Sequence, residues 1–313
     1  MSIHIGLAFC VDKIYFSGFV KKDQTLFIDQ LGNVPYPFRY NEEDFFKADN
    51  IPLIANVLKT NLSTESGQTV NLYICIESNL ATLKRIALPE NFNKVEEQEH
   101  ILWDLSQSLI EPVDLYTFYR TDNLFQSEST RDYLTIAIQK KIIGFFKEVC
   151  VKNSYRLADL SVNQLVTEIS LRTMMGENGD GLIVLFKIGS SRIESTFIWN
   201  GIFHSSHYER MPEIATESTK EETLIKTIRS KLKQMEILFE QYLQREIKVN
   251  KIYLYGNDIA DQFLQSLQKS LSVVSLRLNP LQNVDKTARM EKNLPALEKV
   301  TNYVESIGVV LDQ

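Results

Sequence analysis

The chain has 313 residues, which is enough for one large domain or two smaller ones. Hydrophobic residues make up 44% of it and charged residues 24%, as in ordinary globular proteins. The net charge of −6 argues against a general nucleic-acid-binding protein, which is usually basic. No apolar run reaches the ~18 residues that a membrane-spanning helix needs. We therefore expect a globular protein with no nucleic-acid partner and no direct membrane insertion.

The N-terminal segment and the cysteines favour a cytoplasmic location. The first residues alternate as in a strand and lack the basic start and cleavage site of a signal peptide. Cys10, Cys75 and Cys150 are odd in number and widely spaced, which fits neither a disulfide framework nor a zinc site. All three lie in apolar segments, so we expect buried thiols.

Residues 1–79 predict a strand meander, a helix and a further strand. Strands are expected where apolar residues lie between tight polar links, and a helix where they recur every three to four positions. The predicted strands are 3–9, 13–20, 25–31 and 69–76, and the predicted helix is 53–62.

Residues 80–151 predict a compact β-α-β-β-α unit. Pro89 ends its first strand, and Pro112 follows an amphipathic helix with an acidic first turn. We expect both helices to pack on one face of the unit's sheet, which leaves strand edges open to an extended peptide. The predicted strands are 80–88, 113–119 and 133–139, and the predicted helices are 96–109 and 140–151.

The rest of the chain is organised around a hairpin. Leu182–Phe186 is a continuous apolar run, typical of a strand buried on both faces, and Ile193–Trp199 is a second strand. Asn200-Gly201 after it is a strong hairpin pattern, whereas His204–Glu217 is expected to be an irregular polar loop. The other predicted elements are strands 157–160, 251–255 and 273–278, helices 163–174, 221–242, 259–271 and 297–311, and a hinge loop 176–181.

The turn after the apolar strand is a candidate phosphate site. Gly189, Ser190 and Ser191 offer backbone N–H groups and hydroxyls where a phosphate can sit. Lys187 argues against this use, because a phosphate-and-magnesium site needs an acid at the strand end. The alternative is that the segment is only a hairpin turn.

A second, weaker candidate is a metal site formed by His204, His207 and Glu209. These residues lie in a predicted loop with no cysteine nearby. No P-loop, G-x-S-x-G or G-x-G-x-x-G motif is present.

Both halves repeat one plan of hairpin, helix, strand and helix, with the β-α-β-β-α unit inserted in the first half. This plan resembles the actin-like (ribonuclease H-like) superfamily, and more narrowly the PilM family of type IV pilus assembly proteins. The cell-division protein FtsA is a more distant relative. As an alternative, the chain resembles an uncharacterised group of Bacteroidetes proteins with this fold. The stretches that carry the resemblance are 80–114, 133–160, 182–203 and 251–279. It implies a two-domain α/β fold with a first domain 1–79 and 152–175, an inserted subdomain 80–151 and a second domain 176–313.

The family's nucleotide motifs are degenerate in this chain. The family carries Asp-x-Gly in both phosphate loops; Ala8 and Cys10 stand in the first, and Lys187 replaces the acid of the second. Magnesium needs oxygen ligands, so the loss of both acids predicts no ATP hydrolysis and at best weak, metal-independent ATP binding. No catalytic or metal-binding residue is assigned. The residues left to contact a nucleotide are Lys187, Gly189, Ser190, Ser191, Gly256 and Asn257.

The resemblance implies a non-catalytic scaffold, or pseudo-ATPase, with a protein partner at the cytoplasmic side of a pilus-like or secretion-like envelope assembly. The family's partner is the short cytoplasmic tail of an inner-membrane protein, held near the inserted subdomain, so the chain is expected to be cytoplasmic and peripheral to the membrane. The alternative is an actin-like ATPase or kinase with a non-standard metal site. Glu194 and Asp258 are the nearest spare acids for that role.

Overall fold

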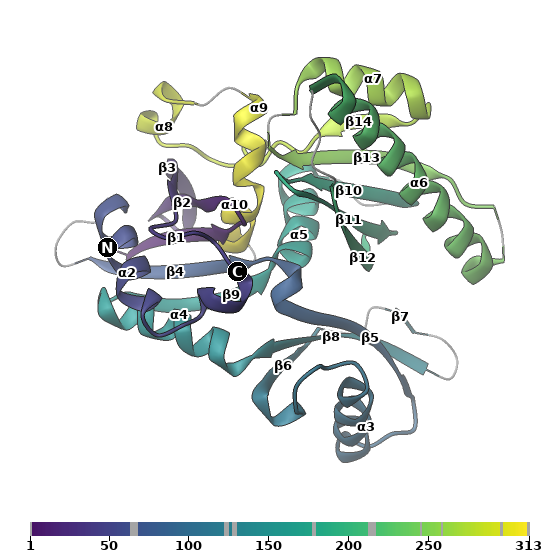
Figure 1. Cartoon of the computed structure of the whole chain (residues 1–313), viewed down its shortest axis with the longest axis horizontal. Helices are drawn as coiled ribbons and strands as arrows, with labels where there is room; N and C mark the ends of the chain where they lie inside the picture. Colours follow the sequence, from purple (N-terminus) through teal and green to yellow (C-terminus); the bar gives the residue numbers. More distant parts are fainter. Residues whose placement is uncertain are drawn as a thin grey trace. The chain divides into compact units, whose positions relative to one another are not determined.

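The computed structural model describes residues 2–62, 68–121, 125–126, 130–176, 180–211, 217–244, 246–257, 259–294 and 297–311. Three sheets and their helices form an α/β structure in this part of the chain (Figure 1). Internal contacts divide the chain into unit 1, Met1–Ile14 with Asn33–Asn163, and unit 2, Tyr15–Gly32 with Gln164–Gln313. The domain boundaries expected from the sequence remain a prediction.

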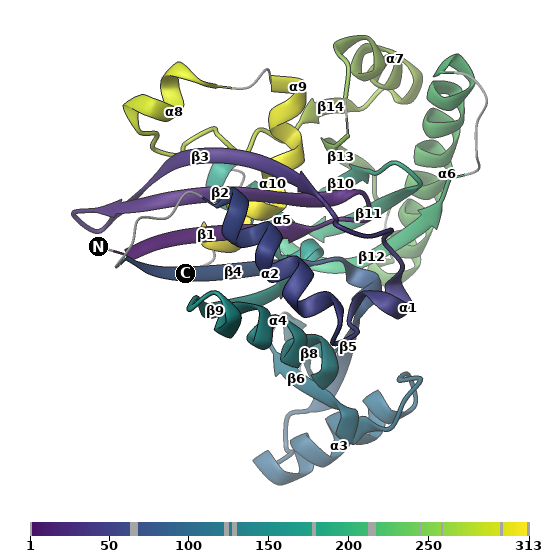
Figure 2. The ribbon, with the colours of Figure 1, turned by 60° about the vertical axis from the view of Figure 1, so that its left-hand side comes forward.

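The first sheet has the strand order β3-β2-β1-β4-β9. Its strands β1, β4 and β9 are parallel, and β1 runs in register from Ser2 opposite Thr69 to Phe9 opposite Ile76. The helices α2 and α4 pack against each other, and α4 also contacts β9 (Figure 2). The elements are β1 (Ser2–Phe9), β2 (Lys13–Lys22), β3 (Thr25–Pro35), α1 (Glu42–Phe45), α2 (Asn50–Asn61), β4 (Thr69–Ile76), α4 (Lys140–Lys152) and β9 (Arg156–Val162).

The inserted subdomain has the predicted β-α-β-β order, with a short extra strand. Its sheet order is β5-β8-β6, and β7 also pairs with β8. α3 begins at a capping box, in which the Asn93 side chain accepts from the Glu96 N–H and the Glu96 carboxylate accepts from the Asn93 N–H. Its elements are β5 (Ala81–Pro89), α3 (Lys94–Ser106), β6 (Tyr116–Arg120), β7 (Phe125–Gln126) and β8 (Thr130–Gln139).

One packing prediction for this subdomain is wrong. α3 packs on the inserted sheet through Ile101 and Leu105, which share a core with Tyr133. α4 instead packs on α2 and β9. The reason is its aromatic face, because Phe145 and Phe146 contact the rings of a cluster built outside the insertion, including Phe9, Phe45 and Phe46. Only α3 therefore covers the inserted sheet.

The sheet of unit 2 has the order β12-β11-β10-β13-β14, with β10 antiparallel to β11 and parallel to β13. The hairpin prediction at Asn200-Gly201 is confirmed, since both residues have the positive φ angles, 49° and 76°, that such a two-residue turn requires. Among the described residues, no helix combines the length and the apolar character needed to cross a membrane. The elements are α5 (Asn163–Met175), β10 (Leu182–Ile188), β11 (Arg192–Trp199), β12 (Ile202–Arg210), α6 (Glu217–Leu243), β13 (Val249–Gly256), α7 (Asp261–Leu271), β14 (Val274–Arg277), α8 (Ala288–Lys292), α9 (Leu297–Val300) and α10 (Val304–Leu311).

The polar loop predicted at His204–Glu217 is also wrong over its first half. Residues up to Arg210 belong to β12, which pairs antiparallel with β11 across a register shift next to Phe197. β12 lies at the edge of the sheet, and its second half is exposed. Backbone hydrogen bonds to β11 are enough to form such a strand, so its sequence does not need alternating apolar residues. Residues 212–216 lie outside the described part of the chain.

Candidate functional site

The structure brings the two predicted nucleotide turns together. β10 and β13 are parallel neighbours, so the turns after them lie at one edge of the sheet, where Ile188 is opposite Gly256. The Asn257 N–H donates to the Ile188 carbonyl at 2.8 Å. Ser190 and Ser191 are exposed in the first turn, which the Gly189 N–H closes by donating to the Arg192 carbonyl at 2.9 Å.

Gly256 has a structural reason to be glycine. Its φ of 101° is one that L side chains rarely adopt, and a Cβ at this position would lie 2.5 Å from the Ile188 carbonyl oxygen. The close approach of β13 to β10 therefore accounts for this residue without a nucleotide.

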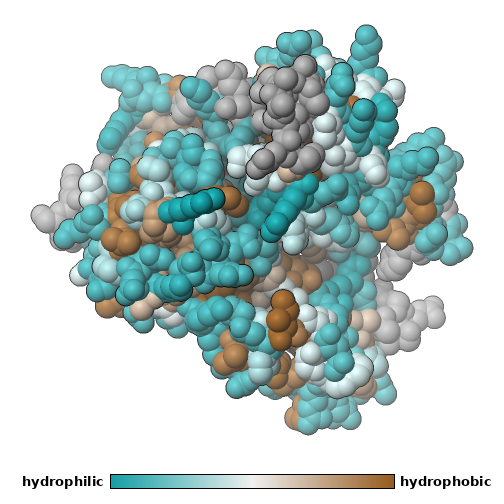
Figure 3. Space-filling view, viewed as in Figure 1, coloured by the Kyte–Doolittle hydropathy of each residue, from teal (hydrophilic) through white to brown (hydrophobic). Residues whose placement is uncertain are grey.

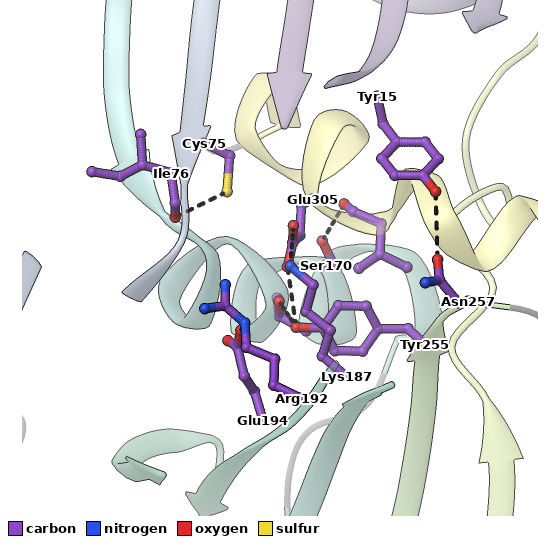
Figure 4. Close-up of polar contacts among 12 residues, drawn as sticks. Tyr15, Cys75, Ile76, Ser170, Lys187, Arg192, Glu194, Tyr255, Asn257 and Glu305 are labelled. Carbon is purple, nitrogen blue, oxygen red and sulfur yellow. Dashed lines mark hydrogen bonds and ion pairs between the residues drawn. The ribbon is translucent and has the colours of Figure 1, made fainter. Parts of the chain in front are cut away.

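Lys187 stands in a row of polar side chains across three strands. The register places it opposite Glu194 of β11 and beside Tyr255 of β13, on the sheet face that packs against α5 and α10. Its ammonium lies 2.7 Å from a carboxylate oxygen of Glu305 in α10, and the two side chains are 9% and 4% exposed (Figure 4). Lys187 is therefore paired with a buried carboxylate.

Hydrogen bonds extend this pair into a buried network. The Tyr255 hydroxyl donates to Glu305 at 3.4 Å and accepts from the Thr167 hydroxyl at 3.0 Å. Burial, followed by the charge of Glu305, raises the pKa of Tyr255 well above its ordinary value, so the phenol stays neutral. Arg192 and Glu194 form a second ion pair at 3.0 Å. The network therefore contains two cations, Lys187 and Arg192, and two carboxylates, Glu194 and Glu305, and each buried charge has a partner of opposite sign.

Side-chain hydroxyls that bond to backbone carbonyls hold α10 and the residues before it against this network. The Ser170 hydroxyl lies 3.3 Å from the Val304 carbonyl, and the Ser17 hydroxyl donates to the Ser306 carbonyl at 2.7 Å. The Thr301 hydroxyl donates to the Gly256 carbonyl at 2.9 Å. Glu305 is thereby fixed next to Lys187.

Sequence reasoning missed Glu305, which lies 118 residues from Lys187. One pattern points to it: Glu305 is the only charged residue in the apolar helix VESIGVVL. A single acid among core residues usually has a buried partner.

The other predicted positions take structural roles. Ala8 and Cys10 are buried, and the Cys10 N–H and carbonyl bond to the Lys13 carbonyl and the Tyr36 hydroxyl. Of the two spare acids, Glu194 pairs with Arg192, and Asp258 lies outside the described residues.

The two histidines pack against different aromatic rings. His204 contacts Phe239 of α6, whereas His207 contacts Phe197 of β11. Partial burial, followed by the charge of Lys231, lowers the pKa of His207. In the described ranges, no three metal-ligating side chains gather as a metal site requires.

A cavity in unit 1 is a second candidate site. It has a volume of about 210 Å³ and lies where α1 meets the start of the insertion and the end of β8; we call it the Asn79 pocket. Neither polar atom of the buried Asn79 amide has a hydrogen-bond partner among the described residues. The lining also includes Ile110, which is 99% exposed, the two acids Glu42 and Glu43, and one cation, Lys141. The cavity thus offers an unsatisfied amide, an apolar contact and an acidic rim.

The comparisons with known proteins establish the fold. No protein-family model and no curated protein matches the sequence. Among solved structures, a PilM-PilN type IV pilus biogenesis complex matches with a TM-score of 0.76 at 13% identity, over 99% of this chain and 98% of the other. The chain has an actin-like fold of the PilM kind.

Two further structures are similar at lower scores. One is the cytoplasmic domain of EpsL, an inner-membrane component of the type II secretion system of Vibrio cholerae (TM-score 0.48, 8% identity, 86% of this chain and 94% of the other). The other is a Bacteroides thetaiotaomicron protein described as having an actin-like ATPase fold and unknown function (TM-score 0.47, 14% identity, 94% and 95%). At these identities the PilM likeness defines the fold, and the function has to be argued from the sites.

Proposed function

We propose that this chain is a non-catalytic, PilM-like scaffold that binds a protein partner at the cytoplasmic side of a cell-envelope assembly. The observation that carries the proposal is the buried ion pair between Lys187 and Glu305. In an actin-like ATPase this strand end needs an acid for magnesium, and here it carries an ammonium that is already neutralised.

The energetics of the buried network favour this proposal over an ATPase. Binding the phosphates of ATP through Lys187 requires breaking its contact with Glu305, which leaves a carboxylate buried and uncompensated. Such a loss costs about 3–5 kcal/mol, comparable to the binding energy of a millimolar ligand.

The Asn79 pocket is the proposed place for the partner. A main-chain segment of a peptide supplies both the donor and the acceptor that the Asn79 amide lacks. Cytoplasmic segments next to a membrane helix are rich in Lys and Arg, which complement Glu42 and Glu43 at the rim. The proposed partner is therefore the basic cytoplasmic tail of an inner-membrane protein, in line with the PilM-PilN complex among the similar structures.

Calorimetry with ATP, with and without magnesium, tests the non-catalytic role. We expect no magnesium-dependent binding, and phosphate release no faster than from Ser191→Glu, whose added charge at the exposed turn repels phosphates. Magnesium-dependent binding at micromolar ATP, or turnover above that variant, would replace the scaffold with the ATPase alternative.

Crosslinking and capture from native membranes tests the partner site. Ile110→Lys should remove a captured membrane protein, because it replaces an apolar contact by a charge that repels a basic tail. Leu294→Lys places the same charge at another exposed apolar position and should not remove it. A synthetic peptide of the captured protein's cytoplasmic tail should then bind the wild-type chain and bind Asn79→Ala more weakly. Equal capture by Ile110→Lys and Leu294→Lys would exclude this pocket.

A further inference from the structure

A second cavity, of about 410 Å³, lies within the inserted subdomain between α3 and the edge strand β6. We call it the Thr135 pocket; Ile101 and Leu102 of α3, Phe118 and Arg120 of β6, and Thr135 of β8 line it. None of the residues that line it also lines the Asn79 pocket. Figure 3 shows hydrophobic patches among hydrophilic surface towards the bottom of the view, where Figure 1 has the inserted subdomain.

The base of the cavity carries the buried hydroxyl of Thr135. Thr135 lies in the central strand, opposite Arg120, and alternation places it on the sheet face of Tyr133, which packs against α3. It therefore points toward the space between sheet and helix. Thr135 is 1% exposed, and its hydroxyl has no hydrogen-bond partner in the part of the chain that the structure describes. A buried hydroxyl without a partner is unfavourable, and a bound acceptor removes that cost.

The charge at the cavity is positive. The buried carboxylate of Glu97 is shared by two guanidinium groups, those of Arg120 at 3.0 Å and Arg131 at 2.5 Å. Lys94 also lines the cavity, whereas Arg131 does not. The lining therefore carries two cations, Lys94 and Arg120, and one carboxylate, which leaves one positive charge in excess beside an apolar cavity and favours an anionic ligand.

The free edge of β6 presents hydrogen-bonding groups at the same place. The Thr121 N–H donates to the Leu134 carbonyl, so Thr121 and, by alternation, Tyr119 bond toward β8. The backbone groups of Phe118 and Arg120 therefore point to the other edge, where no strand pairs among the described residues. Phe118 and Arg120, which line the cavity together with Tyr119, therefore have backbone groups open to an added strand.

We propose that the Thr135 pocket binds an acidic, extended segment of a partner protein that adds as a strand to β6. An apolar side chain of the segment enters the cavity between Ile101 and Phe118, and its carboxylates lie beside Arg120 and Lys94. The charge preference is opposite to that of the acidic Asn79 pocket. This second site does not depend on the function proposed above.

Two acetylated, amidated heptapeptides test the proposal with the full chain. The probe is Thr-Asp-Thr-Phe-Thr-Asp-Thr, whose Asp and Phe side chains share one face of a strand, and its control has lysine at both acidic positions. We expect the acidic peptide to bind more weakly as salt rises, and to slow amide hydrogen exchange at Phe118 and Arg120 but not at Tyr119, which already bonds within the sheet. Equal binding of the lysine peptide, or protection spread evenly along β6, would overturn the proposal.

Thr135→Val is the decisive variant because it keeps the shape and removes only the unsatisfied hydroxyl. It should not destabilise the fold, but it should weaken the acidic peptide about fivefold, the effect of one hydrogen bond. Ile110→Asp, in the other pocket, should leave this affinity unchanged. Unchanged affinity in Thr135→Val together with a loss in Ile110→Asp would assign the peptide to the Asn79 pocket and refute the second site.

Discussion

The buried pair between Lys187 and Glu305 makes a quantitative prediction about stability. Lys187→Met keeps the length of the side chain and removes its charge, so the carboxylate of Glu305 loses its close partner in a site where it is 4% exposed. Glu305→Gln leaves the ammonium in the same position. Breaking a buried pair from one side costs about 3–5 kcal/mol, so each single variant should lower the free energy of unfolding by that amount.

The double variant separates a coupled pair from two independent residues. With both charges removed, no buried charge of the pair is left alone, and Gln at position 305 still accepts from the Tyr255 hydroxyl. We expect the double variant to lose less than about 2 kcal/mol, against about 6–10 if the two effects simply added.

Urea unfolding followed by the fluorescence of Trp199 measures these values in unit 2. Trp199 is buried in β11, on the sheet that carries Lys187, and a Trp103→Phe background removes the exposed second tryptophan. Two results would contradict this interpretation of the site. One is a loss of less than about 1 kcal/mol in the free energy of unfolding for Lys187→Met. The other is a loss for the double variant that equals the sum of the losses for the two single variants.

Three further predictions concern the same sheet and the core of unit 1. Gly256→Ala should destabilise unit 2 by more than the ~1 kcal/mol of an ordinary glycine replacement, because its Cβ meets the Ile188 carbonyl oxygen; the shift in urea midpoint measures this. The pKa of Tyr255 is raised in the folded state, so above pH 10 the unfolded chain ionises first, and stability should fall by about 1.4 kcal/mol per pH unit from this group; a Tyr255→Phe variant should lack that component of the pH profile. Burial raises the pKa of Cys150 to about 12, so iodoacetamide at pH 8 should modify this thiol only in urea, and rapid labelling of the native chain would contradict its burial.

Local patterns in the sequence determined most of the elements. The apolar run Leu182–Phe186 is the first part of β10, which is buried along its whole length, and Asn200-Gly201 is the hairpin turn. Both are short-range effects of residue type on the backbone, so neighbouring residues suffice to predict them. The order of strands and helices then supported the actin-like fold, and the missing acid at Lys187 supported a degenerate nucleotide site.

The tertiary structure decided what these residues contact. Register between β10, β11 and β13 sets Lys187 between Glu194 and Tyr255, and α10 brings Glu305 to it from far along the chain. The same holds for β12, which forms through backbone pairing at a sheet edge, and for α4, whose aromatic face finds its partners outside the insertion. These contacts join residues that are distant in the sequence, and their energy comes from burial, charge pairing and backbone hydrogen bonds that no local pattern records.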